Sequence, residues 1–310
     1  MQLIRRIANR SRDALFIAPL DALWSGDMRG KVTCLLYHRV GEPAGDFLDR
    51  GGSPVITPRE FARDLDLLRG LGAMFMTFED LRHGRFPNRD QIGVIISFDD
   101  CFASNYTIGL EVIERAGVKA TFFQTTGLVD ANELLWEHEL YWHTRDDEHA
   151  ARFAASVEHL REEVAPEVLA PLLAAARDDP AAMSEAARAL YPTSDQLRAA
   201  RRKGHEIGSH GHHHYKRVNI SAETFESELR TSAERLEAIL GERAGAFSYP
   251  FNSYVDGDAA ICARHFAQAV TVDKKRITRD SDPFSLPRFT WPGPSRNAMR
   301  QRRWILTGRI

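Results

Sequence analysis

The stretch Ile92-Gly-Val-Ile-Ile-Ser-Phe98, followed at once by Asp99 and Asp100, decides the fold. It is apolar on both faces, which is typical of a strand buried within a parallel sheet. The runs 32–37 and 120–123 have the same character. Further, shorter strands are expected at residues 206–209, 245–249, 267–272 and 285–289.

Helix signals separate these strands. Thr57 is a candidate N-cap, with Pro58 at the first helical position and Glu60 as the acid of a capping box. Ser221 and Gly241 begin and end a second amphipathic stretch. Seven or eight strands alternating with helices predict a parallel α/β architecture, either a barrel or an open sheet. The alanine-rich stretch at about 133–201 has no strand signal, so we expect a helical insertion there that covers the barrel mouth.

Composition excludes several classes of protein. The 310 residues are 43% hydrophobic and 27% charged, which excludes a disordered chain or a coiled coil. The net charge of −2 gives no reason to expect a nucleic-acid partner. Three cysteines without CxxC spacing argue against a disulfide framework and for a reducing compartment. Because no stretch is long and apolar enough to span a membrane, we expect a cytoplasmic protein.

Both ends of the chain are basic. Residues 1–30 have the pattern of a basic amphipathic helix, and residues 291–310 form a basic tail with five arginines and no acid from Arg296 onward. Such segments could lie on the anionic inner face of a membrane as a peripheral contact. The alternative is that they pack on the body of the protein, residues 31–290, with solvated arginines.

Polar residues that suit a metal site follow two of the strands. Asp99 and Asp100 lie at the carboxyl end of their strand, where ligands bind in parallel α/β folds. His210 and His214 are four residues apart, a spacing that lets two imidazoles meet at one ion. Asp100, His210 and His214 would leave coordination positions open, with Asp99 beside them as an acid or base. One aspartate could instead cap a helix, and the histidines could form a solvated loop.

Three motifs carry a resemblance to a known family. Ser97-Phe-Asp-Asp100, Gly204-His-Glu-Ile-Gly-Ser-His-Gly-x-x-His214 and Phe247-Ser-Tyr-Pro-Phe251 resemble the first three motifs of the polysaccharide deacetylases of carbohydrate esterase family 4. The resemblance runs from about residue 32 to 289. It implies a distorted (β/α) barrel with about seven parallel strands and a metal-dependent deacetylase. It also implies Asp99 as base and a divalent metal, usually Zn²⁺, held by Asp100, His210 and His214.

The chain departs from the family pattern at several positions. Cys101 stands where a glycine is common, and Ser248 where an arginine normally holds the base ionised. Phe251-Asn252 replaces the usual Tyr-Gly pair. Arg288, at the end of a predicted strand, is our candidate to supply the missing positive charge.

The remaining roles follow from the resemblance as well. His38, which ends the first predicted strand, resembles the general acid of the branch that acts on poly-N-acetylglucosamine; the alternative is a packed structural histidine. The third motif assigns substrate binding to Tyr249, Pro250 and Phe251, with a backbone N–H near Phe251 for the oxyanion.

These residues predict hydrolysis of the acetamide of an N-acetylated sugar. The expected partner is a saccharide, either in a glycan or in a lipid-linked precursor made at the inner membrane face. Two other functions stay open. One is a saccharide-binding domain that has lost catalysis, and the other is a metal hydrolase acting on a different amide or ester.

Overall fold

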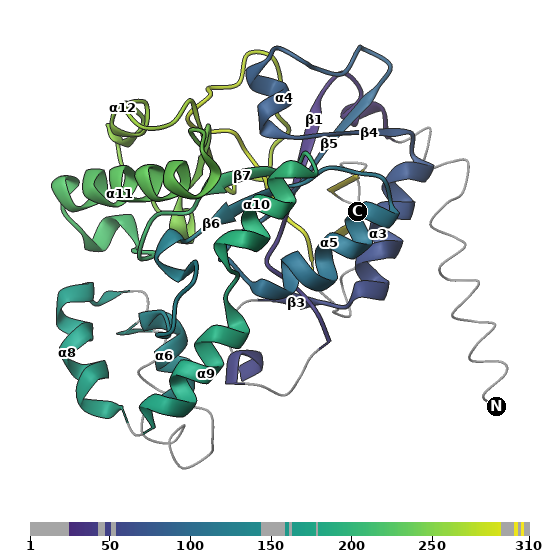
Figure 1. Cartoon of the computed structure of the whole chain (residues 1–310). Coiled ribbons are helices and arrows are strands. Elements are labelled where there is room, and N and C mark those ends of the chain that lie inside the picture. Colours follow the sequence, from purple (N-terminus) through teal and green to yellow (C-terminus); the bar gives the residue numbers. More distant parts are fainter. Residues whose placement is uncertain are drawn as a thin grey trace, which may run out of the picture.

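The computed structural model describes residues 25–42, 47–50, 54–143, 159–160, 163–177, 179–292, 301–302 and 305–306. At its centre lies a parallel sheet in the order β10-β1-β5-β6-β7-β8-β9, with β4 also paired to β5 (Figure 1). The strands are β1 (Val32–Tyr37), β4 (Ala73–Met76), β5 (Ile92–Phe98), β6 (Thr121–Gln124), β7 (Glu206–Ser209), β8 (Ala246–Ser248), β9 (Gln268–Val270) and β10 (Phe289–Thr290). The predicted distorted (β/α) barrel is therefore confirmed.

The segment 286–290 brings the two outer strands of the sheet together. Leu286 forms a bridge to Val270 of β9, and Phe289 pairs with Leu35 of β1. We expected one strand over 285–289, but Pro287 has no N–H to donate to a ladder, so regular pairing begins only at Phe289. The barrel thus has an irregular seam, and Arg288 lies in it.

Alternation along the strands gives the barrel two apolar faces. One cluster fills its interior; it includes Val32, Cys34, Ile95, Phe123, Ala246, Val270 and Leu286. The neighbouring residues of the same strands point outward into the larger core beneath the helices. Gly208 of β7 is inward-facing, and a Cβ there would lie 2.7 Å from the Phe123 ring. Glycine at this position therefore makes room for the ring that fills the interior.

Helices cover the outside of the sheet. They are α3 (Pro58–Gly70), α5 (Leu110–Arg115), α10 (Ser194–Arg202), α11 (Ala222–Leu240) and α12 (Asp258–Cys262). The capping box expected from the sequence begins α3, with both Thr57 and Glu60 making its hydrogen bonds. Gly241 ends α11 in the left-handed conformation, with φ of 75°.

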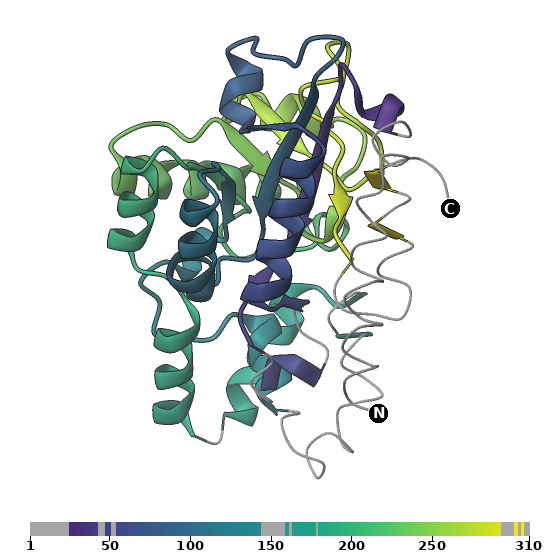
Figure 2. The same ribbon diagram turned by 90° about the vertical axis from the view of Figure 1, so that its right-hand side faces the viewer.

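Between β6 and α10 the described residues include the α-helices α6 (Trp136–His143), α8 (Pro166–Ala176) and α9 (Pro180–Leu190). They lie together at one end of the barrel, at the bottom of Figures 1 and 2, while α4 (Phe78–Arg82) lies at the other end. Because this segment leaves the sheet at the carboxyl end of β6, it lies on the side where the polar strand ends converge.

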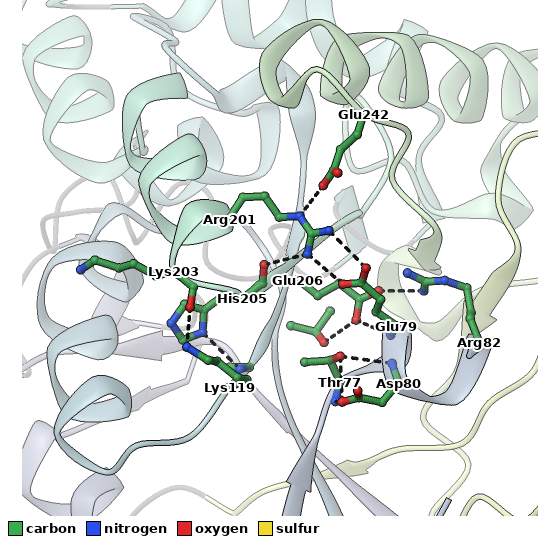
Figure 3. Close-up of polar contacts among 12 residues, drawn as sticks. Thr77, Glu79, Asp80, Arg82, Lys119, Arg201, Lys203, His205, Glu206 and Glu242 are labelled. Carbon is green, nitrogen blue, oxygen red and sulfur yellow. Dashed lines mark hydrogen bonds and ion pairs between the residues drawn. The ribbon is translucent and has the colours of Figure 1, made fainter. Parts of the chain in front are cut away.

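The amino end of the barrel is closed by a polar network (Figure 3). The carboxylate of Glu206 accepts hydrogen bonds from Arg82 at 2.7 Å, from the Thr121 hydroxyl at 3.0 Å and from the backbone N–H of Glu79 at 2.9 Å. Arg201 of α10 in turn pairs with the Glu79 carboxylate at 2.8 Å. These paired charges hold α4 and α10 against β7 at the amino end of the barrel.

The predicted terminal segments are only partly described. We expected a basic helix over residues 1–30. Residues 1–24 of it lie outside the described residues, and Ser25–Met28 form a short 3₁₀ turn. In the tail, Arg302 pairs with Asp64 at 3.1 Å and lies over the ring of Trp291, and Leu306 is buried. The described part of the tail thus packs on the barrel. No helix of the described residues is both long and apolar enough to cross a membrane.

Candidate active site

Asp99 extends β5 by one residue into the barrel mouth. Its N–H donates to the carbonyl of Tyr37 at 3.1 Å, so the strand alternation points its side chain inward, like Ile95 and Ser97. The buried carboxylate receives two parallel hydrogen bonds of 2.8 Å from Arg288 and one of 3.0 Å from the Ser248 hydroxyl. Burial on its own would raise the pKa of Asp99, but Arg288 and His210 together hold it below its usual value.

Arg288 is itself fully buried in the barrel seam. Its guanidinium also donates to the Ser248 hydroxyl at 2.7 Å and to the carbonyl of Thr271 at 3.3 Å, and it lies over the ring of Phe123. The structure therefore brings a positive charge to Asp99 from a strand end far along the chain. The small Ser248 side chain leaves the space that this guanidinium occupies.

Asp100, His210 and His214 converge next to this ion pair. The Oδ1 atom of Asp100 is 3.5 Å from Nε2 of each imidazole, and the two Nε2 atoms are 3.2 Å apart. Asp100 and Cys101 both have positive φ, 73° and 72°, and these two residues form the sharp turn after β5. Neither aspartate caps the following helical turn, because Ser104 occupies that N-cap position.

The imidazoles of His210 and His214 are each oriented by a contact at Nδ1, the ring nitrogen that faces away from Asp100. Nδ1 of His210 lies 2.7 Å from the carbonyl of Ser248, and Nδ1 of His214 lies 3.2 Å from the Glu137 carboxylate. Burial opposes a charge on His214, but Asp100 and Glu137 outweigh it and raise its pKa to about 10. Burial likewise opposes the charge of Asp100, yet His38, His210 and His214 hold its pKa well below the usual range. The carboxylates of Asp100 and Glu137 thus favour a positive charge at the point where the three donor atoms meet.

The histidine-rich loop, residues 210–214, is held to α11 by hydrogen bonds to Glu228. It is therefore not the solvated loop considered as the alternative. Glu228 of α11 accepts hydrogen bonds from the backbone N–H groups of His212 and His213, at 3.0 and 2.7 Å, and from the His213 ring at 2.7 Å. The His212 ring contacts the Thr126 hydroxyl at 2.9 Å. Two of the four histidines therefore fix the loop, and the other two point into the site.

A cavity of about 350 Å³ opens above these residues. His38 lines it together with Asp99, Asp100, His210, His214 and Arg288, and its other walls are Leu36, Pro54, Glu137, Tyr249, Phe251, Asn252, Val272 and Thr290. The Tyr249 ring packs against Phe225 and Phe247 in the outer core, and Pro250 is buried and outside the cavity lining. Of the three residues expected to bind substrate, only Phe251 places its ring beside Asp100, His210 and His214, 4.8 Å from the His214 ring.

Comparison with known proteins identifies the family of this chain. The sequence matches the family model for polysaccharide deacetylase over residues 87–265, which is more than half of the chain. The chain belongs to the polysaccharide deacetylase family. No curated protein matches this chain in sequence.

Solved structures share the deacetylase fold. The Streptococcus pyogenes deacetylase PplD, in complex with acetate, has a TM-score of 0.60 and 18% identity, with 88% of this chain and 98% of that chain covered. IcaB from Ammonifex degensii has a TM-score of 0.61 and 18% identity, with 90% and 97% covered. A polysaccharide deacetylase from Bacillus cereus has a TM-score of 0.59 and 17% identity, with 90% and 69% covered.

Sequence reasoning missed two carboxylates of the deacetylase site. Glu228 had a usable signal, since it falls on the buried stripe of α11 beside Phe225 and Leu229, where an acid needs a partner. Glu137 had none. It lies on α6 in the insertion, and no spacing relates it to His214, 77 residues later.

Proposed function

We propose that this deacetylase is a metal-dependent hydrolase that removes the acetyl group from an N-acetylated sugar. One observation carries the proposal: a single cavity holds an arginine-paired carboxylate and, beside it, a carboxylate oxygen and two imidazole nitrogens within 4.8 Å of one another. The first arrangement suits a general base, and the second suits a catalytic metal with open coordination positions.

The donor set fits a divalent ion such as Zn²⁺. It consists of two imidazole Nε2 atoms and one carboxylate oxygen, and each imidazole is oriented by a contact at Nδ1. We assign Asp100, His210 and His214 as the ligands. When bound there, the ion would supply Lewis-acid activation of water and of the acetamide carbonyl.

We assign the proton transfers to Asp99 and His38. Asp99 accepts the proton of the attacking water, and Arg288 keeps its carboxylate ionised for that purpose. His38, across the same cavity, donates a proton to the departing amine. The backbone N–H of Phe251 is our candidate donor to the oxyanion. The products are acetate and a free amino sugar.

The nature of the sugar carrier is part of the proposal. We favour an amino sugar in a glycan or in a lipid-linked precursor handled in the cytoplasm at the inner membrane face. The basic character of the N-terminal sequence favours the lipid-linked form. Packing of Arg302 and Leu306 on the barrel leaves residues 1–24 as the segment to test for membrane contact.

The test is release of acetate by the zinc-loaded protein from free, oligomeric and lipid-linked N-acetylated sugars, with Asp99→Asn as the matched inactive variant. Turnover by the wild type that is lost in the variant supports the proposal. Zinc binding without acetate release from any member of this panel would favour the saccharide-binding alternative. Release from simple aryl esters or amides alone would favour a hydrolase of different specificity. Flotation with anionic vesicles, before and after deletion of residues 1–24, tests the membrane contact.

A further inference from the structure

We infer that Glu137, on the helical insertion, is a positioning residue for the metal centre: it holds His214 in the orientation and tautomer that binds the ion. This inference rests on the proposed metal-dependent function. The contact is the one between the Glu137 carboxylate and Nδ1 of His214, at 3.2 Å. It means that the site is completed by a segment outside the barrel sheet.

The geometry separates the two ring nitrogens of His214 by role. In the metal-bound form the imidazole is neutral and carries one N–H, so donation from Nδ1 to Glu137 leaves the lone pair on Nε2 for the ion. That Nε2 atom is the one directed at His210 and Asp100, at 3.2 and 3.5 Å. A carboxylate at the outer nitrogen fixes the ring plane and increases the basicity of the inner one.

His210 provides an internal comparison. Its Nδ1 atom contacts a backbone carbonyl, that of Ser248, rather than a charged group. A carbonyl fixes the tautomer as well, but it carries only a partial charge. Of the two imidazoles, His214 is therefore the one whose Nδ1 atom contacts a carboxylate, and that contact can be removed by a single substitution.

The balance of charges in the cavity also supports a role for Glu137 at the metal centre. The titratable groups lining it are His38, His210, His214, Arg288 and the three acids Asp99, Asp100 and Glu137. Asp99 and Arg288 neutralise each other, which leaves the two negative charges of Asp100 and Glu137, whose side chains are only 14% and 12% exposed. One divalent cation with neutral imidazoles balances this pair of charges. Loss of Glu137 would leave the ion with a single compensating carboxylate.

The helix that bears Glu137 is held in place by contacts that do not involve it. The Trp136 indole donates to the carbonyl of His213 at 3.1 Å, which ties the start of α6 to the histidine loop. The Tyr191 hydroxyl accepts from the N–H of Leu135 at 2.9 Å and lies 2.7 Å from Nδ1 of His138. Substitution of Glu137 should therefore remove the contact to His214 and leave α6 docked.

The test is zinc affinity, measured by competition with a chromophoric chelator, for the wild type, Glu137→Gln and Glu137→Ala. Glu133→Gln is the matched control, since it removes the same charge from a nearby side chain that is 74% exposed. We expect binding weaker by about 10- to 100-fold for Glu137→Ala, a smaller loss for Glu137→Gln, which keeps an acceptor oxygen, and no change for the control. The visible spectrum of the Co²⁺-loaded protein should shift in Glu137→Ala only.

The outcomes are separable. Zinc binding by both Glu137 variants within about twofold of the wild type, with an unchanged Co²⁺ spectrum, would overturn the inference and leave the proposed function standing. A wild type that binds no zinc and releases no acetate refutes the proposed function itself. If Glu137→Ala fails to fold by circular dichroism, the isosteric Glu137→Gln decides, and wild-type affinity in that variant counts against the inference.

Discussion

Replacing Arg288 by methionine should strongly destabilise the metal-free protein at neutral pH. The substitution removes both 2.8 Å hydrogen bonds to Asp99 and the opposite charge, and it leaves a carboxylate with 5% side-chain exposure without its ion-pair partner. Breaking a buried pair in this way costs about 3–5 kcal/mol. The hydrogen bond from Ser248 to Asp99 survives and compensates only in part.

The pH dependence distinguishes this explanation from simple loss of packing. In the wild type the folded-state pKa of Asp99 is lowered, so its stabilising effect is present above the unfolded value of about 3.9 and is lost as the pH falls through the folded value. In Arg288→Met, burial should raise that pKa, so the variant loses stability as the pH rises above about 4. The difference in unfolding free energy should therefore widen between about pH 4 and pH 7.

Urea unfolding of the metal-free proteins at several pH values measures this difference. Arg288→Lys, which keeps the charge but not the two parallel hydrogen bonds, should lie between the wild type and Arg288→Met. With zinc restored, the acid limb of the kcat/KM profile should move to higher pH in Arg288→Met, because the general base needs its carboxylate ionised. A stability difference below about 1 kcal/mol that does not change with pH would refute the reasoning about the ion pair.

Three further predictions concern the interior. Burial lowers the pKa of His138 to about 4, so this histidine alone should cost about 3 kcal/mol of unfolding free energy as the pH falls from about 6.5 to 4, and His138→Phe should make the curve less steep in that window; an unchanged slope would count against a neutral, buried His138. Gly208→Ala should cost about 1–3 kcal/mol in urea unfolding, because its Cβ would meet the Phe123 ring; unchanged stability would contradict the packing described for the interior. Cys101, at φ of 72°, should tolerate glycine, whereas Cys101→Val should lower the melting temperature; equal melting temperatures for the two variants would count against backbone strain at this turn.

Local patterns predicted most of the barrel. β1, β5 and β7 begin and end at the residues predicted from the sequence, and the capping box at Thr57 begins α3 as expected. β4 had no comparable signal, because three of its four residues are only partly buried and the run Ala73–Met76 is short. Strand β10 was misplaced because the ladder depends on which N–H groups are available, and Pro287 offers none.

The amino-acid sequence by itself determined the alternation of parallel strands with helices and the identity of the aspartates and histidines at the strand ends, and its three motifs implied the barrel through their family resemblance. Apolar periodicity and the order of polar residues at strand ends are local properties that can be seen without coordinates. Only the tertiary structure decided that Arg288 pairs with Asp99 across 189 positions, and that Glu137 reaches His214 from a separate helical segment. Both contacts join side chains whose separation depends on how the seam closes and how the insertion docks, and neither has a fixed spacing along the chain.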